Sequence, residues 1–213
     1  MDPEAEKAVA ARAAAMLVED GMTVGLGTGS TVAHLLTSLA ERGLTVRCAS
    51  TSPRTEGVAR ALGLEVTTLD ELGHLDIAID GADQVDDHGW LIKGGGAAHT
   101  REKIVAAAAD RFVVMVDSTK PVHAFTWPVP LELLEFGLTS TLRLLGDARL
   151  RDVPRSPDGG VIADWHGDVS DPGAAASFLS GTPGVVEHGL FPPSMVSDVV
   201  IARGDRVEHR RIR

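Results

Sequence analysis

Short apolar runs alternate with helix-like segments along the first 120 residues of the chain. The runs have the length of buried strands and lie at 22–26, 46–49, 65–69, 76–79 and 112–116. Apolar positions at helical spacing, with capping and stop residues around them, predict helices at 3–17, 30–39, 53–62 and 97–109. Such an alternation is typical of a doubly wound, mostly parallel sheet, so we predict an α/β fold.

The pattern changes after residue 120, where prolines mark a hinge and shorter strands and turns follow. Two helices are predicted near 137–145 and 172–179. This region is therefore expected to form a second, smaller α+β lobe. Two final strands are predicted at 199–202 and 206–210, and the pattern alone leaves open whether they join the first sheet.

The charge balance is acidic, with 30 acidic against 20 basic residues and a formal net charge of −10. This balance opposes non-specific attraction to phosphate backbones and anionic membranes, so we expect no nucleic-acid or membrane partner. Cys48 is the only cysteine, which excludes an intrachain disulfide and a cysteine-based metal cluster. The N-terminal segment MDPEAEKAVA lacks the pattern of a secretory signal, and a cytoplasmic location is expected.

A loop of small residues separates the first predicted strand from the second helix. It reads Gly25-Leu26-Gly27-Thr28-Gly29-Ser30-Thr31. Backbone N–H groups, hydroxyls and a helix N-terminus together can bind a phosphate. The spacing departs from the dinucleotide fingerprint because Ser30 stands where the third glycine belongs, and a P-loop lysine is absent from it. The alternative is a tight strand-to-helix turn capped by Ser30 or a neighbour.

Two carboxylates follow the predicted strand at 76–79. Asp80 and Asp83, with Gly81 and Ala82 between them, should emerge at the carboxyl end of that strand, where open α/β sheets bind ligands. The pair could bind sugar hydroxyls, exchange protons during ring opening, or share a cation. A turn with two solvated aspartates is the alternative, and metal binding is the weaker interpretation.

Two lysines in loops could contact an anion. Lys93 can neutralise a phosphate or a developing oxyanion, and Gly94, Gly95 and Gly96 allow a backbone path that other residues resist. A flexible turn with a surface lysine is the alternative. Lys120 follows the strand at 112–116 and is either a second anion contact or a solvated lysine.

Glu102 falls in the second turn of the helix predicted at 97–109. The helix dipole and Lys93 should hold its carboxylate ionised, which makes Glu102 a candidate general base beside a sugar carbonyl. The alternative is a surface glutamate paired with a neighbouring basic residue. His99 lies three residues earlier and could tune the pKa of Glu102.

Four segments, in this order, resemble the active-site segments of type A ribose-5-phosphate isomerases. They read VGLGTGSTVAHLL, DIAIDGADQVD, LIKGGGAAHTREKIVA and VVMVDSTK. A weaker likeness continues in PVPLELLEFG, GGVIADWHG and GTPGVVEHGLF, so the resemblance covers nearly the whole chain.

The resemblance implies an aldose–ketose isomerase that interconverts ribose 5-phosphate and ribulose 5-phosphate in the non-oxidative pentose phosphate pathway, without metal or cofactor. It implies Glu102 as proton acceptor, assisted by Lys93 and by Asp80 or Asp83. The substrate contacts implied by the family's pattern are Thr28, Gly29, Ser30, Thr31, Asp80, Gly81, Ala82, Asp83, Lys93, Gly94, Gly95, Gly96, Lys120 and Lys7.

The resemblance also implies an architecture and an assembly. A Rossmann-like large domain would comprise residues 1–126 and 199–213, with the C-terminal strands returning to its sheet. Residues 127–198 would form the small α+β lobe. A homodimer or a dimer of dimers is expected.

Two other functions fit parts of the same pattern. A non-catalytic sugar-phosphate sensor would keep the loop at Thr28 but could lose the base at Glu102. A deaminase, a lactonase or a CoA-transferase relative of similar fold would need a different catalytic set.

Overall fold

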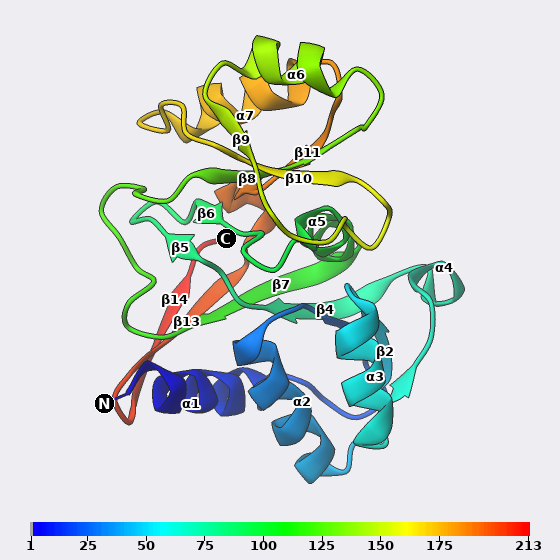
Figure 1. Ribbon diagram of the computed structural model, residues 1–213. Coiled ribbons are helices and arrows are strands. Elements are labelled where there is room, and N and C mark those ends of the chain that lie inside the picture. Colours follow the sequence, from blue (N-terminus) through cyan, green and yellow to red (C-terminus); the bar gives the residue numbers. More distant parts are fainter. Residues whose placement is uncertain (1) are drawn as a thin grey trace.

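The computed structural model describes residues 2–213 and shows a large central sheet with a smaller sheet stacked above it (Figure 1). Seven strands form the large sheet in the order β14-β13-β7-β4-β1-β2-β3. They are β1 (Thr23–Leu26), β2 (Arg47–Ser50), β3 (Glu65–Val66), β4 (Leu75–Asp80), β7 (Ala109–Val116), β13 (Asp198–Arg203) and β14 (Arg206–Arg211). All neighbours are parallel except β13 and β14, which confirms the predicted mostly parallel sheet.

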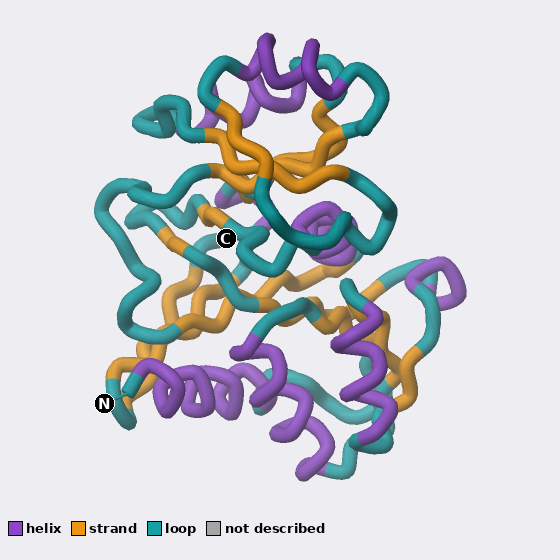
Figure 2. The backbone as a smooth tube through the Cα atoms, in the orientation of Figure 1, coloured by secondary structure: helices purple, strands orange, loops and turns teal. Residues whose placement is uncertain are grey.

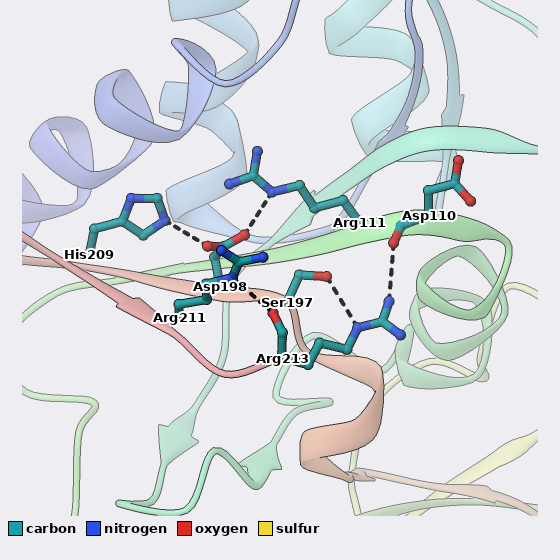
Figure 3. A pocket seen from close by; sticks show the side chains of 7 residues that line it. All are labelled: Asp110, Arg111, Ser197, Asp198, His209, Arg211 and Arg213. Carbon is teal, nitrogen blue, oxygen red and sulfur yellow. Dashed lines mark hydrogen bonds and ion pairs between the residues drawn. The ribbon is translucent and has the colours of Figure 1, made fainter.

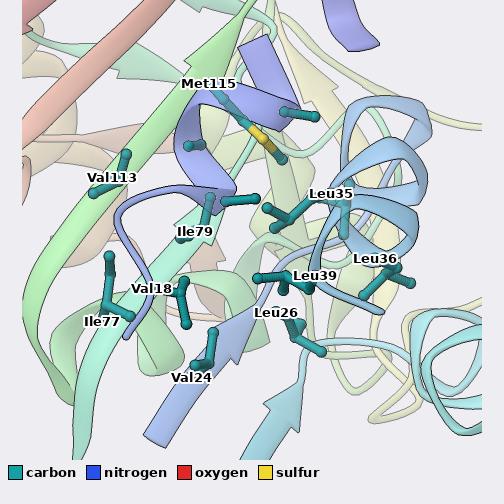
Figure 4. Packing of buried hydrophobic residues seen from close by; sticks show 14 of the residues in the cluster. Val18, Val24, Leu26, Leu35, Leu36, Leu39, Ile77, Ile79, Val113 and Met115 are labelled. Carbon is teal, nitrogen blue, oxygen red and sulfur yellow. The ribbon is translucent and has the colours of Figure 1, made fainter. Parts of the chain in front are cut away.

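Helices cover both faces of the large sheet. Three of them share a core with one face: α1 (Pro3–Ala15), α2 (Ser30–Arg42) and α3 (Pro53–Ala61). Two others contact the opposite face: α4 (Leu69–Leu72) and α5 (His99–Ala107). The first core is apolar and closed, with Leu26, Leu35, Ile79 and Met115 packed between the helices and the sheet (Figure 4). Burying this one-sided apolar surface stabilises the doubly wound arrangement.

The smaller sheet is antiparallel and has the order β11-β8-β10-β9. Its strands are β8 (Val129–Leu133), β9 (Ala148–Leu150), β10 (Val161–Trp165) and β11 (Val185–His188). Helices α6 (Leu138–Leu145) and α7 (Pro172–Gly181) lie on its outer side (Figure 2). A separate apolar core forms between these elements, which accounts for the predicted α+β lobe.

A third, short sheet was not predicted. It pairs β5 (Gln84–Val85), β6 (Leu91–Ile92) and β12 (Leu190–Phe191), and β12 precedes the short 3-10 helix η1 (Pro193–Met195). Runs of two residues are too short to show a period. Because β12 returns from the small lobe to pair with β6, the chain crosses between the two regions close to the site. The domain division at 126/127 and 198/199 stays a prediction.

Several predicted elements differ in extent from the observed ones: β7 begins at Ala109 rather than at 112, and α2 ends at Arg42 rather than at 39. Two further differences have a clear physical cause. The strand predicted at 65–69 ends at Val66, because Thr68 and Glu71 form a capping box that starts α4. The helix predicted at 97–109 runs only from His99 to Ala107. Ala97 has a φ of 58°, in the left-handed region, so a right-handed helix cannot include it. Within residues 2–213, no helix combines the length and apolar character needed to cross a bilayer.

Candidate active site

The site lies at the carboxyl ends of β1 and β4, the two neighbouring strands at which the order of the sheet reverses. Leu26 pairs with Ile79, and the Gly27 N–H donates to the Ile79 carbonyl at 3.1 Å. The loops that follow these strands therefore leave the sheet side by side. In open α/β sheets this switch point is where ligands bind.

Almost all of the predicted site residues line one pocket of about 130 Å³ above these strand ends. They are Lys7, Thr28, Gly29, Ser30, Thr31, Gly81, Ala82, Asp83, Lys93, Gly94, Gly95, Gly96, Glu102 and Lys120. Asp80 is not in the lining, because its side chain is buried below Lys93. The fold thus brings together residues from Lys7 to Lys120, while their individual roles stay predictions.

One end of the pocket is built from the N-terminus of α2. Gly29 precedes the helix with a φ of 125°, a conformation open to glycine and rare for other residues, and no side chain caps the helix. The cap predicted at Ser30 or a neighbour is therefore Gly29, and no serine hydroxyl caps the helix. The Ser30 hydroxyl instead accepts a hydrogen bond from Lys7 Nζ at 2.9 Å. First-turn N–H groups without a side-chain cap, beside an ammonium group, are suited to bind an anion.

The other end holds a buried lysine between two carboxylates. Lys93 Nζ lies 2.8 Å from Asp80 Oδ2 and 3.1 Å from Glu102 Oε2, and each of the three side chains is 3–4% exposed. Gly27 is needed beside this cluster, because a Cβ there would come within 1.9 Å of the Asp80 carboxylate. Three charges in so small a buried volume strongly influence one another's protonation.

The electrostatics of Glu102 differ from the prediction. Burial raises the pKa of Glu102 to about 8, the Asp80 carboxylate adds to the rise, and the Lys93 ammonium opposes it. The prediction that the helix dipole and Lys93 hold Glu102 ionised is therefore wrong, since desolvation and the Asp80 carboxylate outweigh Lys93. Burial also raises the pKa of Asp80, against the lowering effect of Lys93.

For Lys93 the neighbouring charges, rather than burial, decide the direction of the pKa shift. Burial alone would lower the pKa of its ammonium group, but Asp80 and Glu102 outweigh that effect and raise it. Lys93 therefore stays positively charged. The raised pKa of Glu102 leaves its carboxyl group mostly protonated at neutral pH. Glu102 Oε2 is close enough to Lys93 for an ion pair but lacks the alignment of a hydrogen bond, and within residues 2–213 it has no hydrogen-bond partner. When the carboxyl group is ionised, this unpartnered oxygen is available to take a proton.

His99 cannot tune Glu102 as a charged group. Its ring is fully buried, and desolvation first of all lowers the pKa of His99 to about 4. The imidazole is therefore neutral at physiological pH. A Cβ at Gly94 would come within 2.8 Å of its Nδ1, so His99 packs beneath the glycine loop.

Sequence reasoning missed a contact from the small lobe. Glu132, on β8, is 2% exposed and its carboxylate accepts hydrogen bonds from the hydroxyls of Thr100 and Ser156. Thr100 lies in the first turn of α5, two residues before Glu102, so Glu132 supports the helix that carries Glu102. The available signal was a charged residue within the apolar run VPLEL.

A larger hollow of about 710 Å³ lies at the amino ends of β7 and β13, opposite the site (Figure 3). Three of its charged groups are paired with one another: Asp198 contacts Arg111 at 2.7 Å and His209 at 3.0 Å. None of the predicted site residues lines it. The smaller pocket at the switch point is therefore the candidate active site.

Comparisons with known proteins identify the family of this chain. The family model for ribose 5-phosphate isomerase A (phosphoriboisomerase A) matches residues 47–206. A ribose-5-phosphate isomerase A of Levilactobacillus brevis is 41% identical, covering 98% of this chain and 97% of its own.

Solved structures extend the likeness to the whole fold. The structure of a ribose 5-phosphate isomerase A from Methanocaldococcus jannaschii has a TM-score of 0.92 and 35% identity, covering 99% of this chain and 100% of that one. Another, a D-ribose-5-phosphate isomerase in complex with phospho-erythronic acid, has a TM-score of 0.93 and 33% identity, covering 99% and 100%. The fold and its relatives define an isomerase. The chain belongs to the ribose 5-phosphate isomerase A family.

Proposed function

We propose that this protein interconverts D-ribose 5-phosphate and D-ribulose 5-phosphate through an enediolate, in the non-oxidative pentose phosphate pathway. The observation that carries the proposal is the placement of the Lys93 ammonium 3.1 Å from a Glu102 oxygen that has no hydrogen-bond partner within residues 2–213. Moving a proton between two sugar carbons requires one base and one positive group for the oxyanion. Glu102 and Lys93 supply these two groups.

The rest of the pocket suits the two ends of a sugar phosphate. Lys7, Ser30 and the N-terminus of α2 would hold the phosphate, with Lys120 as a further cation on the pocket wall. A relative solved with phospho-erythronic acid supports a small phosphorylated ligand here.

Asp83 is the better placed of the two aspartates for ring opening. It lines the pocket and accepts a hydrogen bond from the Gly95 N–H at 2.8 Å, which leaves oxygen lone pairs for a sugar hydroxyl. Asp80 is 3% exposed and bound to Lys93. We therefore assign proton exchange with the ring oxygen to Asp83 and the orientation of Lys93 to Asp80.

A coupled assay tests the function directly. Ribulose 5-phosphate should form from ribose 5-phosphate at equal rates with and without EDTA. Absence of product in both conditions would overturn the proposed reaction. Loss of product with EDTA alone would overturn only the prediction that no metal takes part. The homodimer or dimer of dimers and the cytoplasmic location remain predictions.

The pH dependence of catalysis should report the raised pKa of Glu102. Catalysis requires the ionised carboxylate, so kcat/KM should rise with pH, by up to about tenfold per unit, until it levels off near the pKa of about 8. The second ionisation of the substrate's phosphate, near about pH 6, gives a separate break. A pH–rate profile measured with the coupled assay distinguishes the two. A kcat/KM that is already constant from about neutral pH upward would contradict the raised pKa.

A further inference from the structure

An arginine from the small lobe reaches the glycine loop of the pocket. Arg151 directly follows β9, and its Nε donates to Asp164 Oδ2 on β10 at 2.8 Å. Its Nη2 contacts the second oxygen of the same carboxylate. This two-point contact fixes the plane of the guanidinium group, since both partners are planar.

The third nitrogen of the guanidinium group hydrogen-bonds to the backbone of the glycine loop at 94–96. Arg151 Nη1 donates to the Gly94 carbonyl at 3.0 Å and lies 3.4 Å from the Gly95 carbonyl. In a trans peptide, the carbonyl and the following N–H point in opposite directions. The Gly95 N–H therefore points away from Arg151, and it donates to Asp83 at 2.8 Å.

The next peptide follows the same geometry. Because the Gly95 carbonyl faces Arg151, the Gly96 N–H points away from the guanidinium group, and Gly96 lines the pocket. Within residues 2–213 this N–H has no hydrogen-bond acceptor. It is therefore free to donate to an oxygen of a bound molecule.

The loop needs an external constraint to keep this orientation. Three successive glycines have more backbone freedom than any other tripeptide, and Gly94 adopts a φ of 110°. Only arginine can bind a carboxylate with two nitrogens and still present a third donor in the same plane. The described lining of the pocket comes entirely from residues between Lys7 and Lys120, so Arg151 acts on the pocket from outside.

We propose that Arg151 is a positioning residue, which holds the Gly94 and Gly95 carbonyls away from the pocket so that the Gly96 N–H faces the substrate. This inference rests on the isomerase function proposed above. The Gly96 N–H would then donate to a substrate oxygen on which negative charge develops, beside Lys93. Such fixed backbone donors act without reorganising during the reaction.

Arg151→Met tests the inference, because methionine keeps much of the apolar stem but removes all of the donors. We expect kcat to fall by about tenfold to a hundredfold, with KM changed by less than about threefold. The amide NMR signals of Gly95 and Gly96 should also shift in the variant. Arg149→Met is the matched control, since Arg149 is an exposed neighbour that pairs with Asp147, and its kcat should equal that of the wild type.

A second variant and a second measurement keep the outcomes distinct. Asp164→Asn keeps the guanidinium group but weakens its two-point contact, so a smaller loss of kcat is expected. If Arg151→Met does not fold, Asp164→Asn tests the inference in its place. A folded Arg151→Met with wild-type kcat and unshifted Gly95 and Gly96 amides would overturn the inference. If the wild type has no isomerase activity, the proposed function fails, whereas the amide shifts still test the positioning.

Discussion

Glu102→Gln is expected to lower kcat by about two to four orders of magnitude, the effect of losing a general base. Glutamine has the same shape as glutamate but cannot take up the proton that moves between the two sugar carbons. The pH–rate limb assigned to the carboxyl, with its pKa of about 8, should disappear together with the activity. The coupled assay gives kcat, and repeating it across the pH range gives the profile.

Binding and folding should survive this substitution. Lys93 keeps its 2.8 Å contact with Asp80, and the groups placed at the phosphate end of the pocket are untouched. Calorimetry with the substrate should therefore give a dissociation constant near that of the wild type. Glu56→Gln is a suitable control, because Glu56 is a partly exposed residue of α3 that pairs with Arg60 and does not line the pocket. Turnover close to normal in Glu102→Gln would remove Glu102 from the role of base.

Lys93→Met is expected to destabilise the fold by roughly 3–5 kcal/mol, as is typical when one partner of a buried ion pair is removed. The side chain of Lys93 is 3% exposed and carries the positive charge between Asp80 and Glu102. Without it, two carboxyl groups remain buried with no counter-charge. Both should then be protonated in the folded state over a wider pH range than in the wild type.

The direction of the pH effect follows from proton binding. Between the unfolded pKa of about 4 and the raised folded pKa, the folded variant binds more protons than the unfolded chain. Its free energy of unfolding must therefore fall as pH rises through that window. Urea unfolding at about pH 5 and at about pH 8 should show a larger deficit relative to the wild type at the higher pH.

A triple variant separates charge from packing in this prediction. Adding Asp80→Asn and Glu102→Gln to Lys93→Met removes both uncompensated carboxyls while keeping similar shapes. Part of the lost stability should return, and its pH dependence should weaken. An equal deficit at both pH values in Lys93→Met would show that lost packing, rather than unpaired charge, dominates.

The local pattern of the chain predicted the strands of the large sheet but not those of the short third sheet. Runs such as Leu75–Asp80 are long enough to show an apolar period, and they became buried strands. The two-residue strands Gln84–Val85 and Leu91–Ile92 show none; they pair with each other, and a distant segment, Leu190–Phe191, adds the third strand. Pairing between residues so far apart in the chain leaves no local signal.

The site likewise has residues that the sequence predicted and residues that it did not. Small residues, aspartates and a lysine after predicted strand ends were enough to locate the pocket, because parallel strands expose their carboxyl ends on one edge. Arg151 was not predicted, because its contact with the carbonyl of Gly94 joins a loop of the small lobe to the large sheet. Glu132 gave only a weak signal, a charge within an apolar strand.

By itself, the amino-acid sequence determined the alternation of strands and helices and the set of residues that can carry out the chemistry. Only the tertiary structure decided the protonation of Glu102, whose pKa is raised to about 8 rather than lowered. The physical reason is that periodicity and residue type are local properties. Desolvation depends on every group packed around a side chain, and the chain brings Asp80, Lys93 and Glu102 together only when it folds.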